Sequence, residues 1–221
     1  MSSNFDFKNF KIRMVSASFI GAIFISSIFL GLSYFAVLMS FVCYFMAKEW
    51  YEIAGGEKKD LIGGLVLIFF AILSLLVLRA LKGGEFIVFW YFSVIWAFDC
   101  FAMIGGKIIG GKKLCEKISP HKTWSGALSG ILAAIIVTII IGAFVDFKAI
   151  GDYYIFRFNI VLITIFIAII SHMGDLLESY FKRKYNFKDS GSIIPGHGGV
   201  LDRFDSILLS APTLLILLLV I

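Results

Sequence analysis

Side chains that could do chemistry are concentrated between positions 175 and 206, beside two apolar stretches of the chain. Asp175, Asp202 and Asp205 supply carboxylates, and Lys182 and Arg203 are two of the cations around them. Carboxylate oxygens are the ligands that Mg²⁺ prefers, while Lys and Arg bind phosphate oxygens. A bilayer strongly disfavours these charges, so the segment predicts either a surface anchor or a polar active site. The mixture of both charge signs favours an active site that binds Mg²⁺ and a nucleoside triphosphate.

The spacing of these residues predicts that they share helical faces. Asp175, Glu178 and Lys182 are three and seven residues apart, so they lie on the same side if the helix continues past Asp175. Asp202 and Asp205 are three residues apart where the last apolar segment begins, after a turn rich in Pro and Gly. The plainer alternatives are a salt-bridged helix end for Asp175 and helix capping for the other two aspartates, which leaves the surrounding cations unexplained.

A second polar loop covers residues 105–123 and carries glycine pairs next to lysines, at Gly105-Gly106-Lys107 and Gly110-Gly111-Lys112. Glycine lets backbone amides approach a phosphate closely, and lysine adds positive charge. A simple positively charged anchor at the membrane surface is the alternative.

Two other kinds of potential metal ligand give weaker signals. His197 has no His, Cys or carboxylate neighbour at zinc spacing, which leaves a general base, a phosphate donor or an ordinary turn residue. Cys43, Cys100 and Cys115 are too scattered for a metal motif and are expected to be packing residues.

The elements that position these residues are predicted to be membrane helices. The chain has 221 residues, of which 60% are hydrophobic and 16% charged, well outside the soluble range. The uncharged stretch from Met14 to Ala47 is too long for one crossing and predicts a hairpin that turns at Gly31-Leu32-Ser33. Five further apolar segments cover 61–78, 86–104, 124–145, 154–174 and 207–221. We therefore expect an all-α, polytopic integral membrane protein of about seven helices, the last one short.

The distribution of cations predicts the orientation of the chain. Lys and Arg are retained on the cytoplasmic side, and with the N-terminus inside most of them fall in cytoplasmic segments. The predicted outer cations are only Arg79, Lys82, Lys148 and Arg157. Both polar loops then lie in the cytoplasm, as expected for a multi-pass protein of the cytoplasmic (inner) membrane. The positive face suits anionic lipids or phosphates rather than nucleic acid.

No internal repeat or soluble domain is visible, so residues 1–221 are predicted to form one membrane-embedded catalytic domain with its signature region at 175–206. That region resembles the C-terminal signature of phosphatidate cytidylyltransferases, also called CDP-diacylglycerol synthases. The matching residues are Ser179, Lys182-Arg183, Lys188-Asp189-Ser190-Gly191, Pro195 to Gly199, Asp202-Arg203 and Asp205. The resemblance also covers 47–50, Asp99, 119–126 and 174–176, with departures at Phe101, Met103, Ser125 and His172.

The resemblance implies transfer of a cytidylyl group from CTP to phosphatidate, which gives CDP-diacylglycerol and pyrophosphate. It implies Mg²⁺, as one ion or a pair, held by Asp175 and Asp202 with Asp205 as a further ligand or supporting carboxylate. Lys188 and Asp189 are expected in the catalytic pocket. The expected substrate-binding residues are Ser179, Lys182, Arg183, Arg203, His197, Ser119, Lys122 and Thr123. The phosphate of phosphatidate is itself the nucleophile, so no Ser or Cys triad is needed. Family habit implies a homodimer.

Two alternatives remain open from the sequence. A related CTP-dependent transferase would use an isoprenoid or ether-lipid phosphate as its acceptor, because the bland apolar helices do not identify the lipid. A cation transporter would use Asp99 and Asp175 as ion sites within the membrane, but it leaves the long charged loop unexplained.

Overall fold

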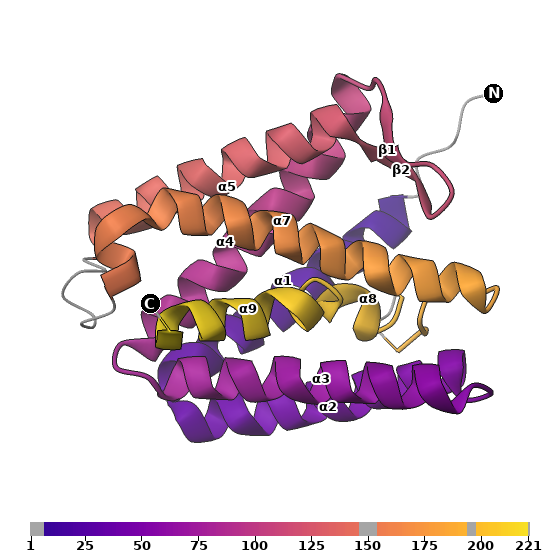
Figure 1. The fold of residues 1–221 in the computed structure, drawn as a ribbon, viewed down its shortest axis with the longest axis horizontal. Coiled ribbons are helices and arrows are strands. Elements are labelled where there is room, and N and C mark those ends of the chain that lie inside the picture. Colours follow the sequence, from indigo (N-terminus) through magenta and orange to yellow (C-terminus); the bar gives the residue numbers. More distant parts are fainter. Residues whose placement is uncertain (1–6, 146–153, 194–197, 221) are drawn as a thin grey trace.

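The computed structural model describes residues 7–145, 154–193 and 198–220, which form a bundle of long helices (Figure 1). Long apolar runs become helices because a membrane leaves no other partner for backbone polar groups. The helices are α1 (Phe7–Leu30), α2 (Leu32–Ala54), α3 (Lys58–Ala80), α4 (Gly84–Ile108), α5 (Trp124–Phe144), α7 (Tyr154–Lys184), α8 (Leu201–Phe204) and α9 (Ile207–Val220). The strands β1 (Lys113–Cys115) and β2 (Ser119–Thr123) pair antiparallel between α4 and α5.

Five helical stretches are long and apolar enough to cross a membrane: α2, α3, α4, α5 and residues 160–184 of α7. The apolar part described for α1 covers Ser18–Leu30, and α9 has 14 residues, about 21 Å at 1.5 Å per residue. That length is short of a hydrocarbon core of about 30 Å. The all-α membrane class is confirmed, and seven full crossings stay a prediction.

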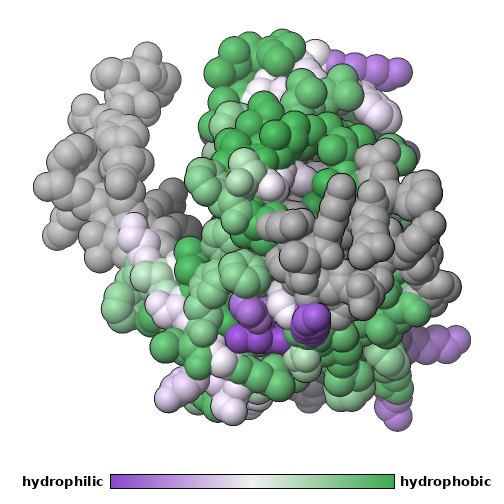
Figure 2. All heavy atoms as spheres, turned by 90° about the vertical axis from the view of Figure 1, so that its left-hand side faces the viewer, coloured by the Kyte–Doolittle hydropathy of each residue, from purple (hydrophilic) through white to green (hydrophobic). Residues whose placement is uncertain are grey.

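Large apolar side chains face outward along these helices, as a lipid-facing surface requires. Phe41, Ile62 and Leu132 lie on three different helices, and each is at least 60% exposed. The end of the bundle seen in Figure 2 is likewise mainly hydrophobic. Exposed apolar surface on this scale is unusual for a water-soluble protein.

The first predicted turn is confirmed at Gly31, although it is tighter than expected. Gly31 alone separates α1 from α2 and has φ 126°, a conformation that favours glycine. Leu32 and Ser33 already belong to α2.

Close helix packing places the ends of α4 and α5 side by side. A Cβ on Gly126 would lie 2.5 Å from the Ala102 carbonyl oxygen, and one on Gly130 would lie 2.8 Å from Phe98. Glycine therefore allows the two backbones to approach. Deeper in the bundle, α9 packs between α3 and α7 (Figure 1), and the Tyr91 hydroxyl lies 2.6 Å from Ser210 Oγ, linking α4 to α9.

Two local expectations are wrong. The polar loop at 105–123 is in part a β-hairpin, in which Lys113 pairs with Thr123. Residues 201–206 do not open the last helix, because α8 ends at Phe204 and α9 begins at Ile207. The Asp205 carboxylate accepts a hydrogen bond from the Ser206 amide at 2.7 Å, and such local bonds compete with regular helix. By contrast, α7 does continue to Lys184, which meets the condition under which Asp175 and Lys182 share one helical face.

Candidate active site

A cavity of about 620 Å³ opens where α4 ends, α5 begins and the C-terminal half of α7 passes the β-hairpin and α8. Charged side chains of both signs line it. The cations are Lys107, Lys113, Lys122, Lys182 and Arg203, and the carboxylates are Asp99, Asp175, Asp202 and Asp205. The sequence places these residues far apart, and the packing of the helix ends brings them to one polar site.

The structure brings eight of the predicted site residues together around this cavity. We call the side formed by Lys182, Asp202, Arg203 and Asp205 the α7–α8 wall. The opposite side, the hairpin wall, is formed by Lys107, Lys113, Ser119, His121, Lys122 and Thr123. Asp175 lies on α7 between the two walls.

Four predicted residues do not line the cavity. Ser179 is half-buried and donates a hydrogen bond to Asp175 Oδ1 at 3.3 Å. Arg183 donates to the Phe187 carbonyl at 3.1 Å, and Lys188 and Asp189 are exposed. The prediction for His197 falls outside the described residues. The roles of these five residues stay predictions.

Lys182 is the centre of the charge network on the α7–α8 wall. Its ammonium forms an ion pair with Glu178 one turn back on α7, and it lies 2.6 Å from Asp202 Oδ1. Asp202 Oδ2 accepts hydrogen bonds from the amides of Ser190 at 3.0 Å and Gly199 at 2.9 Å. Burial acts to raise the pKa of Asp202, but the bonds from Lys182 and the two amides outweigh it and lower that pKa below its ordinary value. Asp202 is therefore an ionised, fixed carboxylate.

Asp205 lies only three residues further on and has the opposite electrostatic environment. Its side chain is 8% exposed, and burial raises its pKa well above the ordinary value. The negative charges of Asp175, Glu178 and Asp99 raise it further, against one hydrogen bond from the Ser206 amide. A bound cation would relieve this concentration of negative charge.

Lys122 connects the two walls. Its Nζ lies 2.7 Å from Asp175 Oδ2, which joins β2 to α7. Thr123, the next residue, caps α5 by accepting a hydrogen bond from the Gly126 amide at 3.1 Å. The hairpin is thus fixed to α5 by Thr123 and to α7 by Lys122.

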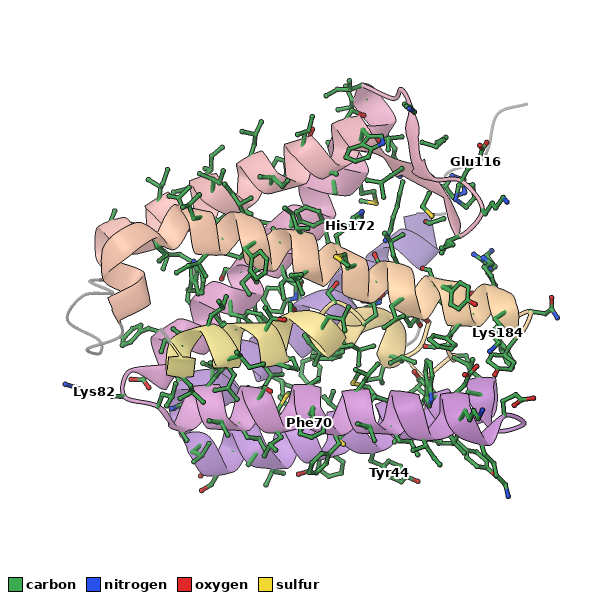
Figure 3. All side chains as sticks on the ribbon, viewed as in Figure 1. Tyr44, Phe70, Lys82, Glu116, His172 and Lys184 are labelled. Atoms are coloured by element: carbon green, nitrogen blue, oxygen red, sulfur yellow. The ribbon has the colours of Figure 1, made fainter. Side chains whose placement is uncertain are left out.

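The chain between α7 and α8 is held at its start by contacts with α3. At the end of α7 (Figure 3), Lys184 forms an ion pair with Asp60 in the first turn of α3. The Tyr185 hydroxyl donates a hydrogen bond to the same Asp60 oxygen at 2.6 Å.

Several cavity residues were missing from the predicted site. Asp99 on α4 and His172 on α7 line the cavity, and Lys107, Lys113 and His121 belong to the hairpin wall. The His172 ring packs edge-on against Phe98 with centroids 5.2 Å apart, and Figure 3 shows it on the side of α7 that faces α4. An isolated carboxylate within an apolar helix was the available signal for Asp99. For the lysines the sequence left phosphate binding and a membrane-surface anchor both open.

The donor set fits Mg²⁺ in kind. Asp175, Asp202 and Asp205 all reach the same cavity with oxygen ligands, which a hard cation prefers. Among the described residues, no group of three or more His, Cys, Asp or Glu side chains is close enough to form a complete metal site. Mg²⁺ commonly binds through one or two carboxylates together with substrate phosphates, so such a cage is not required.

The helices and the cavity define a polytopic membrane protein with a charged site at one end of its bundle. Residues 59–221 match the model of the cytidylyltransferase family. The chain therefore belongs to the cytidylyltransferase family.

Individual relatives agree with this assignment. The chain is 46% identical over 180 residues to a phosphatidate cytidylyltransferase of Rickettsia bellii, covering 81% of this chain and 78% of that protein. It is 43% identical over 176 residues to the Rickettsia conorii protein of the same name, covering 80% and 76%. A phosphatidate cytidylyltransferase of Staphylococcus saprophyticus is 43% identical over 137 residues, covering 62% and 50%.

Proposed function

We propose that this protein transfers the cytidylyl group of CTP to phosphatidate and releases pyrophosphate. The observation that carries the proposal is the cavity at the end of the membrane helices, where Asp175, Asp202, Lys182 and Arg203 meet. The names of the relatives supply the reaction class. A site at a helix end also suits one water-soluble substrate and one substrate that stays in lipid.

The reaction needs alignment and charge neutralisation more than a protein nucleophile. A phosphate oxygen of phosphatidate forms a bond to the α-phosphorus of CTP, and the bond from that phosphorus to the pyrophosphate oxygen breaks. Lys182 and Arg203 on the α7–α8 wall bind the phosphates and neutralise the developing charge. Lys122, with Ser119 and Thr123, holds the substrates from the hairpin wall.

Asp175 and Asp202 would hold Mg²⁺, with Asp205 as a further ligand or supporting carboxylate. When bound, the ion supplies positive charge on the phosphate oxygens. Supporting this role, these carboxylates border the cavity from α7 and from the chain after it. The same proposal includes a cytoplasmic site and N-terminus, and assembly as a homodimer.

The roles left for the remaining predicted residues lie at the edge of the site. Arg183 and Lys188 would contact the headgroup or triphosphate as they enter, and His197 would donate to phosphate. Ser179 supports the Asp175 carboxylate by its hydrogen bond. Asp189 is proposed as a pocket residue.

The test is pyrophosphate release by purified protein in detergent, with CTP, dioleoyl phosphatidate and Mg²⁺. We expect release only when both substrates and the metal are present, and loss of release with EDTA or in Asp175→Ala. Supplying an isoprenoid phosphate or an ether-lipid phosphate instead tests the related acceptors. Release with one of these and not with phosphatidate would reassign the substrate, and release from folded Asp175→Ala at the wild-type rate would contradict the metal assignment.

A further inference from the structure

Glu49 is a buried carboxylate near the end of α2 that does not line the cavity. Its side chain is 1% exposed. Oε2 accepts hydrogen bonds from the Leu201 amide at 2.7 Å and from Ser190 Oγ at 2.9 Å, and Oε1 accepts one from the Val200 amide at 2.9 Å. None of the ion pairs between described residues includes Glu49. Its charge is therefore satisfied by the chain around α8 and not by a cation.

Ser190, one of the residues that bind Glu49, also binds Asp202. Ser190 Oγ, which donates to Glu49, accepts a hydrogen bond from the Asp202 amide at 3.2 Å. The Ser190 amide in turn donates to Asp202 Oδ2, as does the Gly199 amide. Glu49 and Asp202 thus share Ser190 as a partner, and each also binds an amide in residues 199–201. Displacing Glu49 must change the position of Asp202.

Two glycines show how closely the chain approaches this carboxylate. A Cβ on Gly199 would lie 2.5 Å from Glu49 Oε2, and one on Gly191 would lie 2.7 Å from Oε1. Neither distance can be accommodated without movement of the backbone or of Glu49. The absence of a side chain at these two glycines therefore permits the close approach of the chain to the Glu49 carboxylate.

We propose that Glu49 is a positioning residue for the transferase reaction, which fixes residues 190 and 199–201 so that Asp202 and Arg203 face the cavity. The effect on catalysis rests on the proposed function. The effect on the position of residues 190 and 199–201 rests on the hydrogen bonds alone. Glu49 lies before residue 59, where the match to the family model begins. Helix α2 therefore contributes to the site although it lies outside the part of the chain matched by the family model.

The first test compares Glu49→Gln with Glu52→Gln. Glu52 lies one turn further along α2 and has a 54% exposed side chain. Its one ion pair with a described residue is with Lys48 at the surface, so its variant should behave as wild type. In Glu49→Gln an amide group replaces an acceptor and faces backbone donors. We expect kcat for pyrophosphate release to fall by about 10- to 100-fold, as for other groups that support a ligand, with KM for CTP changed less than about threefold. A wild-type kcat in folded Glu49→Gln would overturn the proposal.

A double-variant cycle asks whether Glu49 acts through Ser190. Ser190→Ala removes the shared hydroxyl, so it should lower kcat by the same route. The double variant Glu49→Gln, Ser190→Ala should then lose much less than the product of the two separate losses. Independent, multiplicative losses would mean that Glu49 acts by another route.

A measurement without turnover separates this inference from the proposed function. Hydrogen exchange of the Val200 and Leu201 amides should be faster in Glu49→Gln than in wild type or Glu52→Gln, in EDTA and without substrates, with α3 and α5 unchanged. If wild type releases no pyrophosphate, the proposed function fails while this result still decides the role of Glu49. Unchanged exchange at both amides, or faster exchange throughout the bundle, would overturn the positioning role.

Discussion

The two walls of the cavity differ in how firmly their charges are held. On the α7–α8 wall, Lys182, Asp202 and the amides of residues 190 and 199 bind one another, and Glu49 holds that network from behind. On the hairpin wall, Lys107 and Lys113 are exposed and form no ion pair with another described residue. The first wall is built for fixed geometry, and the two exposed lysines of the second for attraction. Substitutions on the two walls should therefore change different kinetic constants.

The largest expected effect comes from Asp202→Asn on the fixed wall. The variant leaves the buried Lys182 with one partner fewer and turns an amide group toward the Ser190 and Gly199 donors. We expect pyrophosphate release at saturating substrates to fall by about 100- to 1,000-fold. The matched control is Glu116→Gln at the tip of the hairpin (Figure 3), which should keep the wild-type rate. A wild-type rate in Asp202→Asn as well as in the control would show that the fixed position of Asp202 does not matter for the rate.

Lys122→Gln should have the next largest effect, because Lys122 is the ion-pair link between the walls. Without it, the hairpin loses its contact with Asp175, and substrates held between the walls are less well aligned. We expect kcat/KM to fall by about 10- to 100-fold. Lys117→Gln, an exposed neighbour in the hairpin turn, is the control. If both variants lose the same amount, Lys122 contributes only charge.

Gly199→Ala tests the packing behind the fixed wall. The new Cβ would lie 2.1 Å from Ser190 Oγ and 2.5 Å from Glu49 Oε2. We expect the free energy of unfolding to fall by about 1–3 kcal/mol, measured by thermal unfolding in detergent. In Gly56→Ala, by comparison, the added Cβ meets nothing within 4 Å and the melting temperature should stay unchanged. Equal melting temperatures would show that the chain around α8 adapts.

The smallest effect is expected on the attractive wall, from Lys107→Gln combined with Lys113→Gln. These side chains are exposed, so each contributes only screened attraction to phosphates. We expect KM for CTP to rise by about two- to fivefold with kcat unchanged, and its dependence on salt to weaken. Steady-state kinetics at two ionic strengths measures both. A fall in kcat in this variant would place these lysines at the reacting phosphates.

The contrast also shows what the sequence could predict. Apolar runs identified the long helices, and the spacing of Asp175 and Lys182 indicated a shared face if the helix continued, a condition that α7 meets. The spacing of Asp202 and Asp205 correctly predicted that both reach one spot, although the helix breaks between Phe204 and Ile207. These features depend on residues that are close together in the sequence, so they can be predicted from the local pattern of residue types.

Features that depend on distant residues were not predictable in this way. Glu49 stands between Lys48 and Trp50 and looks like any charge at a helix end, yet it binds amides about 150 positions later. Its burial is decided by the docking of the chain around α8 against α2. On the hairpin wall, Ser119, Lys122 and Thr123 were predicted, but Lys113 and His121 were missed for a related reason: they become site residues only when the ends of α4 and α5 approach α7.

The contacts of Asp60 and Glu49 also determine when the site can form during synthesis. Asp60 binds Lys184 and Tyr185 at the end of α7, and Glu49 binds Val200 and Leu201 at the start of α8. Both acidic residues emerge from the ribosome long before their partners, since synthesis proceeds from the N-terminus. Helices α2 and α3 can therefore present Glu49 and Asp60 to the last segment as it arrives. A chain in which α2 and α3 were misplaced would lack the contacts that hold the two ends of the segment from 184 to 201.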